Sequence, residues 1–202
     1  MEKKIDLFAH KSKNWDMNSM RVRNAKEIAD IILKNISIDK SMILADFGAG
    51  TGLLTYFIAP SVGKIVAIDD SRSMLDEFEA KKDEFACATD ILHIDIMDYK
   101  GDEKFDGIIS SMTIHHIKDT QEFFLKLFNM LKENGFIAIA DLDSENGTFH
   151  GDNNGVHHFG FDREKLEAIA KDAGFNDIRF ETANIIEKPN AKFSVFAMMA
   201  RK

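Results

Sequence analysis

Glycines and an aspartate near residue 50 have the spacing of a ligand-binding turn. The stretch 46–52 reads Asp-Phe-Gly-Ala-Gly-Thr-Gly. Glycine at every second position lets the backbone turn sharply and approach a ligand, because no Cβ intrudes. An apolar run, 42–45, precedes the turn, and apolar residues at helical spacing follow it from Leu53. We therefore expect a strand, a glycine turn and a helix whose free N–H groups favour an electronegative ligand group.

Two phosphate-binding motifs do not fit this stretch. A P-loop needs a lysine followed by serine or threonine, and 46–52 contains no lysine. The dinucleotide fingerprint G-x-G-x-x-G needs a third glycine, which would fall at position 53, where the chain has Leu53. The pattern is instead an acid followed by three glycines at alternate positions, so neither motif explains the turn.

Aspartates also follow later apolar runs, at Asp69, Asp95 and Asp141. Ligands of open α/β sheets bind beyond the carboxyl ends of the strands, where an acid about 20 residues after the glycine turn reaches a ribose hydroxyl pair. Asp69 lies 21 residues after Gly48. A single aspartate at a strand end is common, but this series predicts a site for a ligand that contains a ribose.

The elements that would position these residues follow from the hydrophobic pattern. Short apolar runs alternate with amphipathic segments, which predicts a parallel sheet with helices on both faces. The expected strands are 42–45, 64–68, 91–94, 105–111 and 136–140, with two final β segments at 178–182 and 193–200. The expected helices begin after Asp16 or Ser19, at Ser71, at Thr120 and at Asp162, with glycines ending the last two.

Four stretches match successive motifs of one family in order and spacing. They are DFGAGTG, AIDDSRSML, HIDIMD and FDGIISSMTIHHI. From about Ile43 onward the chain resembles the class I S-adenosylmethionine-dependent methyltransferases, of the small-molecule type found in ubiquinone and menaquinone biosynthesis. The resemblance implies a Rossmann-like, doubly wound α/β fold with a mostly parallel seven-stranded sheet, an antiparallel C-terminal edge hairpin and an N-terminal helical segment. We expect a single domain over 1–202, in which 1–40 cap a cofactor-binding core at 41–202.

The resemblance also implies which residues bind S-adenosylmethionine. The glycine turn would contact the amino-acid part of the cofactor, Asp69 the ribose, and Asp95 the amino group of adenine. Asp70 departs from the apolar residue that is more usual after the ribose acid. The expected cofactor-binding residues are Asp46, Gly48, Ala49, Gly50, Asp69, Asp70, Asp95, Ile96 and Ser111.

Methyl transfer needs a general base only when an O–H or N–H acceptor must lose a proton. The candidate bases are His115, His116, His150, His157 and His158. We select His116, which follows the fourth strand, and His157, which lies in the long irregular loop 143–160. Packing without chemistry remains an alternative for His116. Zinc binding by the loop histidines and Asp152 is a further alternative, but they lack compact ligand spacing, so we expect no metal.

Composition limits the partners and the cellular location that the protein can have. The net charge of −8 does not favour nucleic acid as a partner. One cysteine, Cys87, allows no disulfide within the chain. No apolar run approaches the roughly 20 residues of a membrane span, and no signal-type segment follows the first residues. We therefore expect a cytoplasmic enzyme that methylates a small molecule, of undetermined oligomeric state.

Two rival function classes remain open: a nucleotide-binding oxidoreductase, and a protein without catalytic activity that binds a cofactor or partner on the same scaffold. We also expect the polar segments 8–20 and 143–160 to form a mobile cover over the acceptor side. Trp15 is the only tryptophan, and it belongs either to this cover or to an aromatic anchor on the core.

Overall fold

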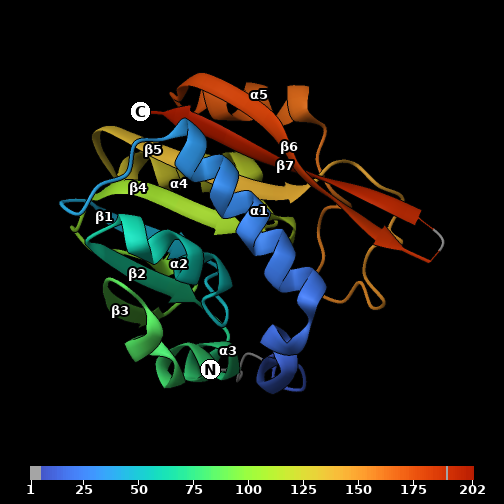
Figure 1. The fold of residues 1–202 in the computed structure, drawn as a ribbon. Helices are drawn as coiled ribbons and strands as arrows, with labels where there is room; N and C mark the ends of the chain where they lie inside the picture. Colours follow the sequence, from blue (N-terminus) through green and yellow to red (C-terminus); the bar gives the residue numbers. More distant parts are fainter. Residues whose placement is uncertain (1–5, 190) are drawn as a thin grey trace.

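The computed structural model describes residues 6–189 and 191–202, and these form an α/β structure around one seven-stranded sheet (Figure 1). The strand order is β3-β2-β1-β4-β5-β7-β6, in which β1 to β5 run parallel and β7 is antiparallel to both neighbours. The strands are β1 (Ile43–Phe47), β2 (Lys64–Asp69), β3 (Ala88–His93), β4 (Phe105–Ser111), β5 (Leu131–Leu142), β6 (Asn176–Lys188) and β7 (Ala191–Arg201). The predicted fold class, with its antiparallel C-terminal hairpin, is confirmed.

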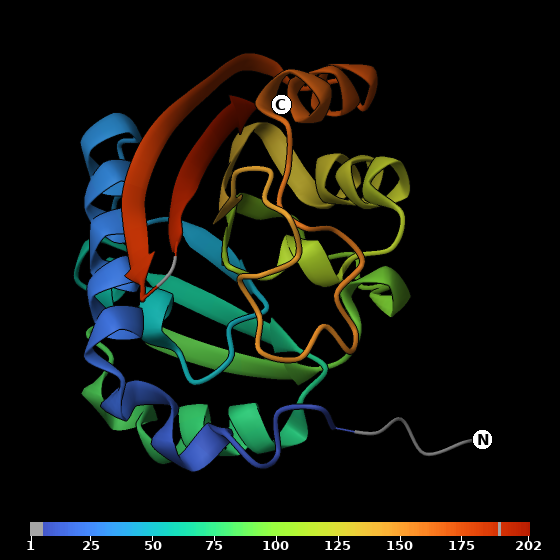
Figure 2. The same ribbon diagram turned by 90° about the vertical axis from the view of Figure 1, so that its right-hand side faces the viewer.

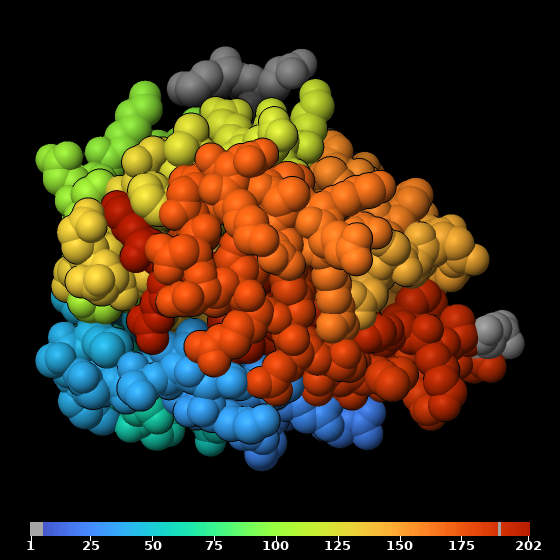
Figure 3. Space-filling model, turned by 90° about the horizontal axis from the view of Figure 1, so that it is seen from above, coloured from blue at the N-terminus to red at the C-terminus, as the bar shows by residue number. Residues whose placement is uncertain are grey.

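Helices cover both faces of the sheet, because the central strands are apolar on both sides. One face carries α1 (Ser19–Asn35), α2 (Leu53–Ile58) and α3 (Arg72–Ala80). The other carries α4 (Thr120–Met130) and α5 (Arg163–Asp172). Seen from above, the residues that follow the loop 143–160, in orange and red, lie between residues in and near α1, in blue, and residues in and near α4, in yellow (Figure 3). None of the helices in the described part of the chain is long and apolar enough to cross a membrane.

Several boundaries of helices differ from the predicted ones. The N-cap of α1 is Asn18, whose side chain accepts hydrogen bonds from the N–H groups of Met20 and Arg21, rather than Asp16 or Ser19. Helix α4 ends at Met130, before the expected glycine stop, since Leu131 already pairs with Phe105 of β4. Strand pairing at Leu131 therefore ends the helix before Gly135, the glycine at which the sequence predicted its end.

The C-terminal hairpin is longer than predicted, and it extends beyond the sheet. Strands β5 and β7 pair as far as Leu142 and Val195, but β6 and β7 continue to the pair Lys188–Ala191. The hairpin tip therefore projects past the carboxyl edge of the parallel strands, beside the loop 143–160 (Figure 1). In Figure 2 this loop, in orange, crosses in front of the edge at which ligands of such sheets bind.

Candidate active site

The glycine turn after β1 has the sharp backbone turn that its sequence predicts. Gly48 and Gly50 have φ of 65° and 55°, a region that favours glycine. The N–H groups of Gly48 and Ala49 donate to the carbonyl of Ile68 in β2, at 2.8 and 3.3 Å. A Cβ on Gly48 would lie 2.2 Å from Cγ2 of Thr113. The turn is thus fixed between β2 and the segment that follows β4.

Asp69 ends β2 directly beside this turn. Its carboxylate accepts hydrogen bonds from the N–H groups of Gly50 and Ser71, both at 2.8 Å. Burial raises the pKa of Asp69 to about 6, although these two hydrogen bonds act in the opposite direction. A carboxylate has about four lone-pair sites, so Asp69 retains capacity for hydroxyl donors.

Asp46 lies deeper than the other predicted cofactor residues. It is 1% exposed, and its carboxylate accepts a 2.6 Å hydrogen bond from the hydroxyl of Thr55 in α2. Burial raises the pKa of Asp46 to about 7. Its observed contact therefore holds α2 to β1, and its direct contact with a cofactor stays a prediction.

The other predicted residues lie along the same edge of the sheet. Asp95 caps the short 3-10 helix η4 (Ile96–Asp98) by accepting from the N–H of Met97 at 3.1 Å, and Ile96 is fully buried. Asp70 is exposed. Ser111, the last residue of β4, accepts a 3.1 Å hydrogen bond from Thr113 at its carbonyl. Their roles in binding stay predictions.

The N-terminal segment packs over the glycine turn. Asp16 accepts a hydrogen bond from the hydroxyl of Thr51 at 2.5 Å and pairs with Lys81 at the end of α3. The Trp15 ring lies 3.7 Å from the Arg21 guanidinium and 5.9 Å from the ring of Phe8. These ring contacts of Trp15 are with other residues near the N-terminus, so its place in a mobile cover over the acceptor side stays a prediction.

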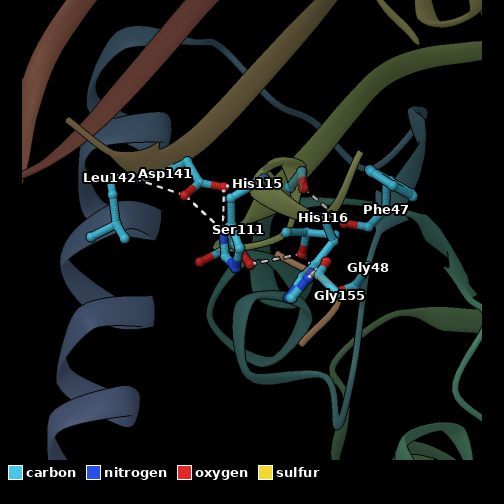
Figure 4. A network of polar contacts seen from close by, with 10 residues as sticks. Phe47, Gly48, Ser111, His115, His116, Asp141, Leu142 and Gly155 are labelled. Carbon is cyan, nitrogen blue, oxygen red and sulfur yellow. Dashed lines mark hydrogen bonds and ion pairs between the residues drawn. The ribbon is translucent and has the colours of Figure 1, made fainter. Parts of the chain in front are cut away.

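A buried imidazole–carboxylate pair joins Asp141, near the end of β5, to His115, in the segment after β4 (Figure 4). The Nδ1 of His115 lies 2.9 and 3.0 Å from the two carboxylate oxygens of Asp141. The N–H groups of His115 and Leu142 also donate to that carboxylate, at 3.2 and 2.7 Å. His115 and Asp141 are 2% and 0% exposed. The carboxylate therefore fixes the orientation of the ring.

Two more histidines join this pair. The rings of His116 and His150 lie 4.2 and 4.8 Å from that of His115, between centroids. The Nδ1 of His116 lies 2.7 Å from the carbonyl of Gly155, and the ring of Phe8 meets His116 edge-on at 5.8 Å. Burial and the neighbouring His115 lower the pKa of His116. We call His115, His116, His150 and Asp141 the histidine cluster.

Comparison with known proteins identifies the family. A methyltransferase domain model matches residues 45–139. An uncharacterized methyltransferase of Schizosaccharomyces pombe is 32% identical over 200 residues, which cover 90% of this chain and 68% of that protein. The chain belongs to the class I S-adenosylmethionine-dependent methyltransferases. A ubiquinone biosynthesis O-methyltransferase of Pelagibacter ubique is 27% identical over 158 residues, or 70% of this chain and 65% of that protein.

A solved structure of another methyltransferase shares the fold. It is the Haemonchus contortus phosphoethanolamine N-methyltransferase 2 in complex with S-adenosyl-L-methionine, with a TM-score of 0.66 and 21% identity. The match covers 86% of this chain but only 52% of that one, so the chain spans about half the length of this relative. S-adenosylmethionine is the cofactor of the family, as the resemblance implied.

The residues present fit this cofactor. A Cβ on Gly50 would lie 3.3 Å from the methyl carbon of Met74 and 4.0 Å from the carbonyl oxygen of Gly48, so the absence of a side chain at Gly50 keeps the turn close to its neighbours. Asp69 offers acceptor capacity at the distance along the chain that ribose binding requires. The turn would hold the methionine part of the cofactor and Asp69 the ribose. These are residues that the sequence predicted for cofactor binding, and the structure places them in contact.

The loop histidines His157 and His158 share a backbone contact but differ in the surroundings of their side chains. The N–H groups of His157 and His158 donate to the carbonyl of His115, while the side chain of His157 is exposed. The Nε2 of His158 lies 2.8 Å from the carbonyl of Ile117. Within residues 6–189 and 191–202, no three His, Cys, Asp or Glu side chains are grouped so that they could hold a metal ion.

Sequence reasoning missed a deeply buried polar contact of the site, between Asp141 and His115. Asp141 was recognised as an acid at a strand end, but its pairing with His115 was not predicted, because nothing local links residues that are 26 positions apart. The role of Asp16 was also missed, since a helix cap was expected there. The one available signal was that Asp141 and the two histidines each follow a predicted strand.

Proposed function

We propose that this methyltransferase acts on a small-molecule acceptor and binds S-adenosylmethionine through residues 48–50, Asp69, Asp95 and Ile96. The observation that carries the proposal is the contact between the glycine turn and the ribose acid, in which the N–H of Gly50 donates to Asp69. Bound S-adenosylmethionine supplies a methyl group that its sulfonium makes electrophilic. The residues of the chain then need to orient the acceptor and exclude water, which can contribute much of the rate.

A small acceptor is supported by the segments that lie over the sheet edge. A Cβ on Gly155 in the loop 143–160 would lie 2.8 Å from Cδ1 of Leu7, and Phe8 contacts His116. The N-terminal segment and the loop therefore meet over the edge. A compound that fits beneath this cover would reach the methyl group, whereas a macromolecule would have to displace both segments.

The contacts between the N-terminal segment and the glycine turn support a single domain. We propose one domain over 1–202, in which 6–40 form the described part of the N-terminal cap and residues 1–5 lie outside the described residues. The negative net charge supports an acceptor other than nucleic acid. A cytoplasmic location is proposed from the single cysteine, which favours a reducing compartment.

Calorimetry tests the cofactor half of this proposal. The protein should bind S-adenosylmethionine and S-adenosylhomocysteine in preference to NAD, because Leu53 stands where a dinucleotide site needs glycine. The substitution Asp69→Ala should weaken cofactor binding by about 1–3 kcal/mol, the cost of hydrogen bonds to a charged group. Tight binding of NAD alone would support the oxidoreductase alternative, and unchanged affinity in the variant would move the ribose contact elsewhere.

The acceptor itself can be found by transfer of a labelled methyl group. Purified protein is incubated with S-adenosylmethionine carrying a labelled methyl group and with fractionated small-molecule extracts. Label should enter a compound that passes a low-molecular-weight filter. Label that enters only protein or nucleic acid would contradict the small-molecule proposal.

A further inference from the structure

Among the described residues, a buried ring nitrogen of the histidine cluster has no hydrogen-bond partner. The Nε2 of His150 is buried, and it makes no hydrogen bond with any residue that the structure describes. A buried polar atom without a partner normally costs free energy. By contrast, Nδ1 of His115 and Nδ1 of His116 lie within hydrogen-bond distance of Asp141 and of the Gly155 carbonyl. This contrast points to a ligand as the missing partner of His150.

His150 also lies at the correct end of the sheet for such a ligand. Thr113 packs against Gly48 of the glycine turn, and His115 follows it two residues later. The His150 ring lies over His115, 4.8 Å away between centroids, and Phe149 meets it edge-on at 4.9 Å. His150 therefore contacts the same short segment after β4 that also packs against the glycine turn.

We propose that His150 is the residue that takes the proton from the methyl acceptor, and that the acceptor is a hydroxyl compound. This inference rests on the proposed function. As the acceptor oxygen forms its bond to the methyl carbon, the carbon–sulfur bond breaks with its electron pair left on sulfur. The hydroxyl proton passes to Nε2 of His150, which becomes an imidazolium and later releases the proton to water. His115 and Asp141 act as positioning residues for the ring.

The electrostatics of the cluster favour oxygen over nitrogen as the acceptor atom. Burial, with the positive charges that His115, His116 and Lys188 would carry, lowers the pKa of His150 to about 4, while Asp141 acts in the opposite direction. The ring is thus neutral at physiological pH and can accept a proton. A base this weak takes a proton from a hydroxyl oxygen that is becoming an oxonium, which is very acidic. It would not take one from a methylated ammonium.

Nuclear magnetic resonance of the full chain tests the contact without turnover. The ring nitrogens of the histidines are labelled with ¹⁵N, and S-adenosylhomocysteine is added, followed by phenol, catechol or 3,4-dihydroxybenzoate; aniline and benzene serve as matched probes. The His150 signals are identified by their loss in His150→Gln. We expect at least one hydroxyl probe, and neither matched probe, to shift Nε2 of His150. If no hydroxyl probe shifts it, or if aniline shifts it equally, the proposal is overturned.

Kinetics with the acceptor fraction found by label transfer provide the second measurement. His150→Gln should lower kcat by about 10²-fold or more, the usual contribution of a general base, with an unchanged Kd for S-adenosylmethionine. Asn154→Gln, in the exposed part of the same loop, is the matched control and should retain activity. A methylated amine, thiol or carbon product, or unchanged kcat in His150→Gln, would overturn the proposal. Absence of any product together with failure to bind S-adenosylmethionine would instead overturn the proposed function.

Discussion

The two parts of the sheet edge that we propose for the cofactor and for the acceptor, called the cofactor side and the acceptor side, are built differently. On the cofactor side, the glycine turn and Asp69 come from two successive strands, and their contacts are made by backbone N–H groups. On the acceptor side, contacting side chains come from segments far apart in the sequence, such as Phe8, His116 and His150. The first region depends on local conformation, whereas the second exists only after the whole chain has folded.

The largest effect should come from adding a Cβ to the glycine turn. In Gly48→Ala the new Cβ would lie 2.2 Å from Cγ2 and 2.3 Å from Oγ1 of Thr113, at a positive φ of 65°. We expect the free energy of unfolding to fall by about 2–5 kcal/mol, combining the backbone penalty with overpacking, and cofactor binding to be lost. Urea denaturation and calorimetry measure the two effects.

A matched control exists on the acceptor side. A Cβ on Gly151, in the loop 143–160, would meet no atom within 4 Å, so Gly151→Ala should leave both quantities within about 0.5 kcal/mol of the original protein. Adding Thr113→Ala to Gly48→Ala removes two of the three closest atoms and should restore part of the stability. If the two glycine variants were equally stable, the proposed dependence on local conformation would be wrong.

Asp46 should make stability depend on pH. Its pKa is about 7 in the folded protein against 3.8 for the free side chain, so the folded state keeps a proton that the unfolded state loses from about pH 4 upward. Stability therefore falls as pH rises from about 4 to 7, by roughly 4 kcal/mol in total at 1.36 kcal/mol per pKa unit. Asp46→Asn removes this contribution.

The measurement is the difference in unfolding free energy between Asp46→Asn and the original protein at several pH values. This difference should shift in favour of the variant as pH rises toward 8, whatever its value at pH 4. Asp69, whose pKa is also raised, contributes to both proteins and largely cancels. A difference that stays constant with pH would show that Asp46 is ionised in the folded protein throughout this range.

The two regions also differ in how far the sequence predicts them. The glycine turn and the position of Asp69 follow from spacing, because a strand–turn–helix unit is encoded within about 25 adjacent residues, whereas the antiparallel edge hairpin was implied by the family resemblance. The Asp141–His115 pair and the unpartnered Nε2 of His150 do not, because each depends on how segments meet across the sheet. The choice of His116 and His157 as bases reflects this limit: sequence spacing does not distinguish adjacent histidines, of which only His115 bonds to Asp141.

The same reasoning explains the wrong boundary predictions. A glycine after an amphipathic run ordinarily ends a helix, yet Leu131 already belongs to β5 because it pairs with Phe105. Asp16 has the chemistry of a helix cap, but its carboxylate bonds to Thr51 and Lys81 instead, and Asn18 caps the helix. In each case a contact with a distant residue replaced a local one.

The smallest effect should come from removing Asp16, whose contacts hold the N-terminal segment 8–20 against the glycine turn. Asp16 joins the N-terminal segment to the glycine turn through Thr51 and to α3 through Lys81. Its removal in Asp16→Ala should cost about 1 kcal/mol, the net value of a hydrogen bond at a partly exposed site. Hydrogen exchange should then become faster in 8–20, and cofactor should change the fluorescence of Trp15 more than in the original protein, because the segment starts more open.

Asp30→Ala is the matched control, since it removes an exposed ion pair with Lys26 on α1 without touching the turn. If both segments, 8–20 and 143–160, are equally protected with and without cofactor in the original protein and in Asp16→Ala, they are fixed walls of the site. The acceptor would then have to enter by a path that leaves them in place.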